Sequence, residues 1–321
     1  MHRRSLLPIL AATALPVSAS AQAAWVPDRP VRIIAPFAAG GAADILARIL
    51  AEEMSPLLGQ QIVVENRTGA GGAVGTESVV RARPDGLTLL LASQATHGIV
   101  PNIVRLNFDP ATGTTPIANL AGVPGVIVVN PELPIRNVAE FAAYVRARPG
   151  ELSYGSAGVG SSTHMSMALL LHMAGLDVAH IPYRGTALAM PDLIAGRIIG
   201  MAETITSGLP AIRDGRVRAI GVSTPQRLAV LPDVAPVAES VPGYDVLNWY
   251  GLVGPAGLPA EVVTTLHGHM QTLLARPAFV ERLASQGAQP LPMSTADFAA
   301  YVARDRQQWA DLVRATGMQV Q

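Results

Sequence analysis

The sequence contains no lysine and no cysteine among its 321 residues. Its 23 basic residues are therefore all arginine, which excludes a lysine Schiff base and a phosphate-binding loop that depends on lysine. Without cysteine the chain forms no disulfide and carries no cysteine-linked lipid, and an exported protein does not require either. The fold must therefore be held by its apolar core.

Charged residues are also scarce. They make up 14% of the chain, the net charge is zero, and no block of like charges occurs. We therefore expect neither nucleic acid nor a membrane surface as a partner. After residue 23, no segment reaches the ~20 apolar residues that a membrane-spanning helix needs. Half of the residues are hydrophobic, so a chain of this length can form two domains, each with its own core.

The first 23 residues have the features of a secretion signal. Arg3 and Arg4 form a charged start, and 6–17 is an apolar run too short to cross a membrane. Small residues before Ala21 and Ala23 fit a cleavage site. A buried N-terminal helix is the alternative. We expect an exported, periplasmic protein that is cleaved near one of these two alanines and is not a lipoprotein.

Segments typical of buried strands alternate with segments that have the apolar spacing of helices. Strands are expected at 31–35, 62–65, 88–92, 126–130, 152–154, 178–181, 199–202, 217–222 and 244–253. The alternation predicts an α/β fold in which helices flank mostly parallel sheets. We expect two domains, 24–123 with 229–321 and 124–228. Two crossing strands, near 126–130 and 244–253, would join them beside a cleft.

Two glycine-rich turns, 36–44 and 154–163, each follow a strand and begin a helix. Such a turn presents unpaired backbone N–H groups at the positive end of a helix dipole, which is an anion site that needs no cationic side chain. Either turn alone could be an ordinary tight connection. Two of them facing each other across the cleft would hold a small anion.

Polar side chains in and near these turns are candidates for binding. The hydroxyls of the second turn could donate to a carboxylate, or they could cap the helix. Asp44 could stabilise the first helix or bind a ligand amine. Glu203 ends a strand that is expected to be buried, where it could face the ligand or form a structural hydrogen bond.

Motifs for catalysis and for metal binding are absent from the sequence. No serine lies in a G-x-S-x-G frame, neither glycine run fits G-x-G-x-x-G, and neither the lysine phosphate loop nor H-E-x-x-H occurs. His267 and His269 are two apart on a helix and face different directions. His164 could reach the cleft or could cap and pack its helix. We expect no catalysis, no cofactor and no metal.

Several stretches match a known family in order along the chain: 30–41 with Asp44, 64–72, 84–86, 154–158, 160–161 with His164, 182–185, 231–234 and 251–257. With these stretches the chain resembles the Bug-type extracytoplasmic receptors of tripartite tricarboxylate transporters over essentially its whole mature length. The resemblance implies a two-domain periplasmic binding protein, type II-like, that closes on a small carboxylate between the two glycine turns. It also implies a membrane permease as partner and a monomeric receptor.

One residue departs from the family pattern. Members commonly have aspartate at the position of Glu203, and a longer carboxylate there would shrink the pocket or select a different partner group. The acid itself is left open, and a sensor subunit or an exported enzyme acting on carboxylates remains an alternative. The residues expected to bind the ligand are Phe37, Ala39, Gly40, Gly41, Asp44, Ser93, Gln94, Ser156, Ala157, Gly158, Gly160, Ser161, Ser162, Thr163 and Glu203.

Overall fold

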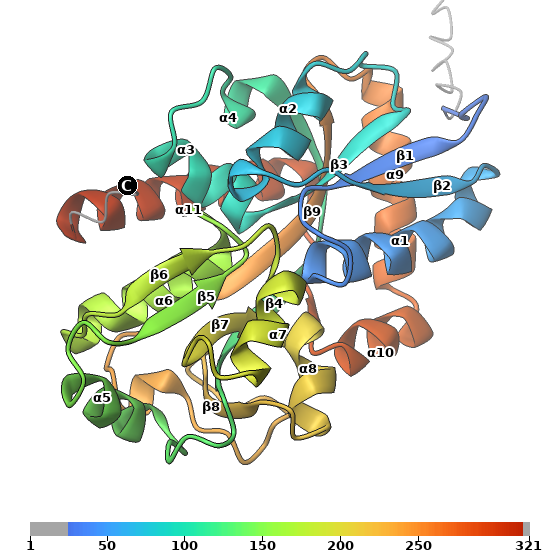
Figure 1. Cartoon of the computed structure of the whole chain (residues 1–321). Helices are drawn as coiled ribbons and strands as arrows, with labels where there is room; N and C mark the ends of the chain where they lie inside the picture. The colour runs from blue at the N-terminus through green and yellow to red at the C-terminus, as the bar shows by residue number, and fades with distance from the viewer. Residues whose placement is uncertain (1–24, 317–321) are drawn as a thin grey trace, which may run out of the picture.

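The computed structural model describes residues 25–316, and the expected signal segment lies outside them. Two α/β domains lie one above the other in Figure 1. The upper domain combines the start of the chain, in blue and cyan, with later segments in orange, whereas the lower domain is formed by the middle of the chain. Within the described residues, none of the helices combines the length and the apolar character that crossing a membrane requires.

The first domain contains a sheet in the order β2-β1-β3-β9-β4. Its strands are β1 (Val31–Ala35), β2 (Ile62–Asn66), β3 (Thr88–Ser93), β9 (Leu247–Pro255) and β4 (Thr114–Val129). β1 pairs in parallel with β2 and β3, whereas β9 is antiparallel to both β3 and β4. Parallel pairing places the glycine turn after β1 and the helical turn η2 (Gln94–Ile99) after β3 at the same edge of the sheet.

The second domain extends the pairing beyond β4 in the order β7-β5-β6. Its strands are β5 (Ser153–Ser156), β6 (Ala179–Pro182), β7 (Gly200–Thr204) and β8 (Arg218–Val222), and β5 is parallel to both β6 and β7. β4 pairs antiparallel with β7 and β8, so this strand belongs to both sheets. It runs through the boundary expected near residue 123, and the boundaries themselves remain predictions.

Helices cover both sheets. They are α1 (Ala42–Leu58), α2 (Ala73–Val80), α3 (Val100–Ile103), α4 (Pro110–Gly113), α5 (Val138–Arg146), α6 (Ser162–Ala174), α7 (Thr186–Ile194), α8 (Ile205–Arg213), α9 (Ala260–Leu274), α10 (Pro277–Ser285) and α11 (Thr295–Thr316). Shorter elements are η1 (Ala70–Gly72), η2 (Gln94–Ile99), η3 (Val237–Glu239) and β10 (Gln289–Pro290). Asn137 caps α5 by accepting from the Glu140 amide at 2.8 Å, as the sequence predicts.

Burial of one face of α1 fixes the first glycine turn in place. Leu46, Leu50 and Met54 follow a four-residue spacing and are fully buried. They share a core with Leu89 and Leu91 of β3. Burying each such side chain stabilises the fold by ~1.5–3 kcal/mol. The N-terminus of α1 is therefore held against the sheet edge by the packing of the helix behind it.

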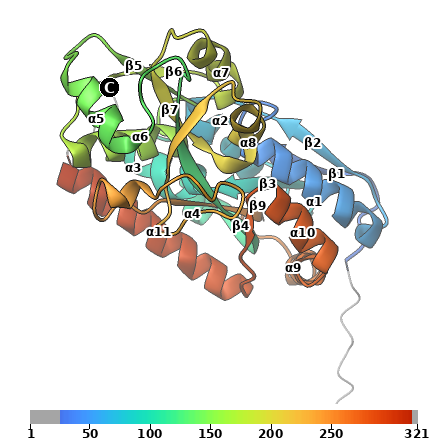
Figure 2. The ribbon, with the colours of Figure 1, turned by 90° about the horizontal axis from the view of Figure 1, so that it is seen from below.

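The last helix, α11, spans both domains, and Figure 2 shows it as the long red helix beneath them. Near its start, Phe298 packs edge-on against Trp249 of β9, with ring centroids 5.6 Å apart. Near its end, Trp309 shares a small core with Ile99 of the first domain and Met165 of α6. The helices that end the chain therefore pack against the sheet that earlier segments form.

Candidate ligand-binding cleft

The first glycine turn satisfies its own glycine amides. The Gly40 N–H donates to Asp44 Oδ2 at 3.0 Å, and the Gly41 N–H donates to the Ala38 carbonyl at 3.2 Å. Gly40 has a φ of +80°, a conformation that favours glycine. The N–H groups of Ala42 and Ala43, in the first turn of α1, have no hydrogen-bond partner among residues 25–316. The amides that remain available to a ligand in this turn are therefore those of the helix.

The second turn is built in the same way. Its Ala157, Gly158 and Gly160 amides donate to Thr163 Oγ1 at 2.9 Å, to Ser156 Oγ at 3.0 Å and to His164 Nδ1 at 3.2 Å, respectively. Ser161 caps α6 by accepting from the His164 amide at 3.1 Å. In the part of the chain that the structure describes, the Ser162 and Thr163 amides are left without a partner. The N-terminus of α6 therefore also has two amides that remain available to a ligand.

Two stacked histidines support the second turn from behind. The rings of His164 and His180 are 4.0 Å apart, and His180 Nε2 lies 2.7 Å from Ser156 Oγ. Burial lowers the pKa of His164 to about 3 and that of His180 to about 4, so both rings are neutral at neutral pH. Ser156 is 0% exposed, so its contact with His180 is structural and gives no accessible nucleophile. His164 thus accepts from the Gly160 amide and packs against His180, which is the structural one of its two expected roles.

The two turns meet at one small cavity, which we call the inner cavity. Its volume is ≈ 30 Å³. It is lined by residues from both domains: Phe37, Ala38, Gly41, Ala42, Ala43, Ala157, Ser161, Ser162, Thr163, Gly185, Thr186, Glu203, Thr204 and Tyr250. The unpaired amides of α1 and α6 both belong to this lining, so the structure brings together the two helix N-termini that the sequence singles out.

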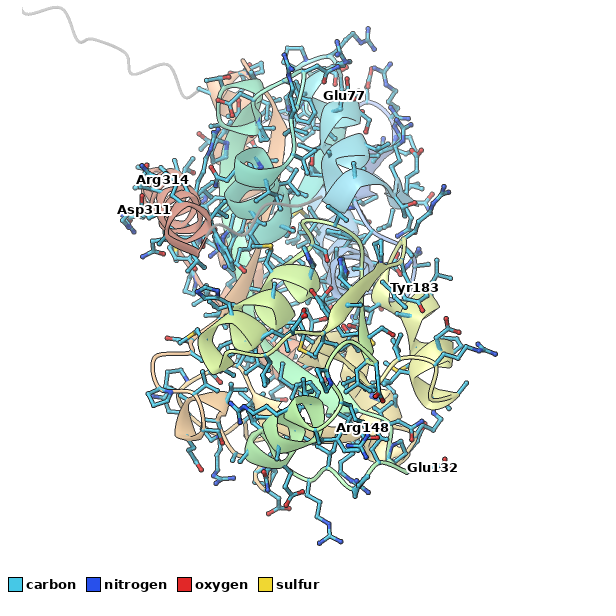
Figure 3. The ribbon with its side chains drawn as sticks, turned by 60° about the vertical axis from the view of Figure 1, so that its left-hand side comes forward. Glu77, Glu132, Arg148, Tyr183, Asp311 and Arg314 are labelled. Atoms are coloured by element: carbon cyan, nitrogen blue, oxygen red, sulfur yellow. The ribbon has the colours of Figure 1, made fainter. Side chains whose placement is uncertain are left out.

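A larger space, which we call the outer cleft, lies next to the inner cavity. Its volume is ≈ 490 Å³. Phe37 and Ala157 line both spaces, and the outer cleft also contains Gly158 of the second turn and Arg184. Its first-domain wall is the turn 68–72, a glycine-rich stretch seen in the sequence but not proposed to bind. Figure 3 shows Tyr183, which belongs to this lining, beside the junction of the domains.

Glu203 lies in the wall of the inner cavity and is only 2% exposed. Its Oε1 accepts from the Thr204 amide at 2.7 Å, from Thr204 Oγ1 at 3.2 Å and from Ser207 Oγ at 2.7 Å. Burial raises the pKa of Glu203 although these donors and Thr186 oppose the shift. The carboxyl expected at the sheet edge is thus both a cavity residue and a hydrogen-bonded one.

Asp44 has a structural role in the first turn. Its carboxylate accepts from the Gly40 amide, from Arg48 and from Asn66, each at 3.0 Å. Burial opposes ionisation, but the donors Arg48, Gly40 and Asn66 outweigh it, and the pKa of Asp44 is lowered. The side chain belongs to the lining of neither the inner cavity nor the outer cleft. The hydrogen bonds that Asp44 accepts fix the conformation of the first glycine turn.

Other expected residues lie behind the cleft or within its turns. Gln94 donates to Asp305 Oδ1 at 3.1 Å and lines a separate cavity of ≈ 260 Å³ beside α11. Ser93 pairs with Tyr250 in the β3–β9 register, behind the inner wall. Neither of these belongs to the inner cavity or the outer cleft, and nor do Ala39, Gly40, Ser156 and Gly160. A ligand contact by these residues remains a prediction.

Sequence reasoning missed seven residues of the inner wall: Ala38, Ala42, Ala43, Gly185, Thr186, Thr204 and Tyr250. The first three and Thr204 adjoin residues that were predicted to bind, whereas the other three come from elsewhere in the chain. Gly185 and Thr186 begin α7, and Tyr250 comes from β9. The stretch 182–185 is prominent in the sequence, but only the folded chain shows that it faces the first turn. Among residues 25–316, no group of three or more acidic or histidine side chains is placed to hold a metal ion.

A family model described as "Tripartite tricarboxylate transporter family receptor" matches residues 46–318. The chain belongs to this receptor family. The resemblance drawn from the sequence is thereby confirmed. The fold, a two-domain periplasmic binding protein, is confirmed by solved members of the family.

Three solved structures are closely similar to this receptor. The periplasmic binding protein BugD is 37% identical, with a TM-score of 0.88, over 92% of this chain and 100% of its own. An R. palustris protein solved with adipate is 32% identical, with a TM-score of 0.88, over 91% and 98% of the two chains. MatC from Rhodopseudomonas palustris with bound malate is 34% identical, with a TM-score of 0.85, over 89% and 99%.

Proposed function

We propose that this receptor binds a small organic carboxylate between the N-termini of α1 and α6 and delivers it to the permease of a tripartite transporter. One observation carries the proposal: two helix N-termini from different domains, each with unpaired amides, line one cavity. Each helix end carries about half a positive charge, so two of them match one carboxylate without an arginine.

The four unpaired amides suit the two oxygens of a carboxylate. Ala42 and Ala43 would donate from the first domain, and Ser162 and Thr163 from the second. An ionised carboxylate offers about four lone-pair sites, so each oxygen can accept from both helices. Binding would thus tie the two domains together, and this explains why the site lies at their junction.

The rest of the ligand would extend into the outer cleft. Phe37 and Ala157 line both spaces and so mark the passage between them. Arg184 lines the outer cleft and forms no ion pair with any other residue of 25–316. It could receive a second carboxylate. Malate and adipate, found in the two related structures, both carry two carboxylates.

Glycines permit the domains to approach closely. A Cβ at Gly185 would lie 2.6 Å from the Ala38 Cβ, and one at Gly71 would lie 2.6 Å from the Val159 carbonyl oxygen. The inner cavity, at ≈ 30 Å³, is much smaller than the outer cleft of ≈ 490 Å³. A carboxylate would enter with the domains further apart. We infer a hinge at β4 between domains 24–123 with 229–321 and 124–228.

The proposal has two further parts: the protein binds its ligand without catalysing a reaction, and it acts in the periplasm. The family is one of receptors, and the buried Ser156 gives no accessible nucleophile. We infer that 1–23 directs export and is removed near Ala21 or Ala23. The receptor would then act as a monomer that meets its permease partner at the membrane.

A thermal-shift screen of residues 24–321 against organic acids tests the proposal. The protein is first unfolded and refolded, which removes any acid carried through purification. An acid at ~100 times its dissociation constant should add ~2.7 kcal/mol of stability. We expect a shift of several degrees for one class of acids, with malate and adipate in the panel. A folded protein that responds to no acid would contradict the proposed function.

A further inference from the structure

Glu203 is an unexpected residue to find in a carboxylate site. Among the residues that line the inner cavity it is the one acidic side chain, and the lining contains no arginine or histidine. β7 ends beside it, and α8 passes so close that a Cβ at Gly208 would lie 2.8 Å from the Glu203 Cγ. Because Gly208 has no side chain, there is room for the Glu203 side chain between α8 and the cavity.

The hydrogen bonds of Glu203 distinguish its two oxygens. Three donors, the Thr204 amide and the hydroxyls of Thr204 and Ser207, converge on Oε1. The Thr204 amide can only donate, and with two hydroxyls also donating to it, Oε1 is the oxygen better suited to remain an unprotonated acceptor. A neutral Glu203 would therefore carry its proton on Oε2 and could donate it.

Within the described residues 25–316, no cationic side chain pairs with Glu203. The other titratable group facing it is Tyr250 on β9, whose pKa is raised by burial and by the negative charge of Glu203. The donors from α7 and α8, Thr186 and Ser207, are neutral hydroxyls. On α1, the Asp44 carboxylate is already paired with Arg48. β4 places the apolar Val126 opposite Glu203.

A bound carboxylate would thus share a small buried space with Glu203. Two carboxylates in contact cannot both stay ionised in such a space, and one of them takes up a proton. The bound acid is the one that faces the unpaired amides of α1 and α6, which favour its charged form. The proton therefore belongs on Glu203.

We propose that Glu203 is the specificity residue of the inner cavity, where it takes up one proton on ligand binding and donates a hydrogen bond from Oε2 to the ligand carboxylate. In the open protein, where water reaches the side chain, Glu203 is ionised. Binding therefore consumes a proton from solution, and the affinity for the acid rises as the pH falls. The inference rests on the proposed function, because it concerns the same carboxylate.

The test compares the dissociation constant of malate, or of the acid with the largest thermal shift, between pH 6.5 and 8.5. Carboxylic acids are ionised throughout this range. Isothermal titration calorimetry in two buffers of different ionisation enthalpy counts the protons taken up. For the wild type we expect the dissociation constant to rise by up to about tenfold per pH unit, with uptake of one proton.

The variant Glu203→Gln supplies a neutral donor of the same length. It should bind the acid with a dissociation constant that does not change with pH, and with no proton uptake. Glu132→Gln is the matched control, since Glu132 is exposed at the outer end of the second domain in Figure 3. It should keep the wild-type pH dependence.

Three outcomes would overturn the inference while leaving the receptor function intact. The wild type could bind the acid with no pH dependence and no proton uptake. It could bind more tightly at higher pH, or a folded Glu203→Gln variant could lose binding altogether. The last two would mean that an ionised Glu203 holds a cationic group of the ligand. Failure of every acid to bind would instead overturn the receptor function itself.

Discussion

Replacing Ala42 by proline tests directly whether the α1 amides hold the ligand. Ala42 is the first residue of α1, where the fixed φ of proline suits the helix and its missing N–H breaks no internal hydrogen bond. The preceding residue must be extended, and Gly41 already is, with φ −79° and ψ 164°. We therefore expect the free energy of unfolding to stay within about 0.5 kcal/mol of the wild type.

The same substitution removes one amide from the inner cavity. A hydrogen bond to a charged group contributes ~1.5–3 kcal/mol. At ~1.4 kcal/mol per factor of ten, Ala42→Pro should raise the dissociation constant for the acid by about 10- to 150-fold. Titration calorimetry measures this change, and urea unfolding confirms that the variant is folded.

Two further variants separate the amide from other effects of proline. Ala260→Pro makes the same change at the start of α9, after Pro259 with a ψ of 142°, and should leave binding unchanged. Ala42→Val adds bulk beside the cavity but keeps the N–H group. If Ala42→Pro binds the acid as the wild type does, or if Ala42→Val weakens binding equally, the reasoning about the amide is wrong.

Three other predictions concern closure, the first turn and acid stability. Gly71→Ala should weaken binding at least ~5-fold through overpacking against the second domain, measured by calorimetry beside Gly59→Ala, which has a similar φ but open space around it. Asp44→Ala should destabilise the fold by ~1–3 kcal/mol, because the first turn loses the three hydrogen bonds that the buried, charged carboxylate accepts, and equal urea midpoints would contradict this. Burial lowers the pKa of His97 to about 4 and that of His164 to about 3. In the unfolded chain both histidines have their ordinary pKa of about 6.5 and take up a proton below it, whereas in the folded protein they stay neutral. The free energy of unfolding should therefore fall as the pH drops from about 6.5 to 4. The loss should reach ~2 kcal/mol per histidine at pH 5. A flat urea midpoint over this range would refute it.

The sequence predicts the position of the site better than its chemistry. A strand, a glycine turn and a helix follow each other twice, and this pattern is local, so both proposed anion sites can be located without the structure. Which amides remain unpaired depends on side chains that fold back onto the turn. Asp44 reaches Gly40, and His164 reaches Gly160. A Gly40→Pro variant would therefore disturb the turn itself and report little about the ligand.

The inner wall also contains residues that no local pattern could assign. Tyr250 enters from β9 because that strand pairs with β3, and Thr186 enters because β6 lies beside β5. The β3–β9 pairing joins segments far apart in the chain, whereas β5 and β6 are consecutive strands on either side of α6. Glu203 was found because its strand ends near the sheet edge, but its hydrogen bonds to Ser207 arise only once α8 turns back over it.

The hydrogen bonds within the two glycine turns help to explain how the receptor could bind a charged ligand with few charged side chains. Each turn uses its own glycine amides to fix its shape, through Asp44 in one domain and the His164–His180 pair in the other. The helix amides that follow are then held in place before any ligand arrives, so binding does not have to order them. Affinity would come from rigid dipoles, and the carboxyl in the inner wall, Glu203, would decide which acids and which pH values allow the domains to close.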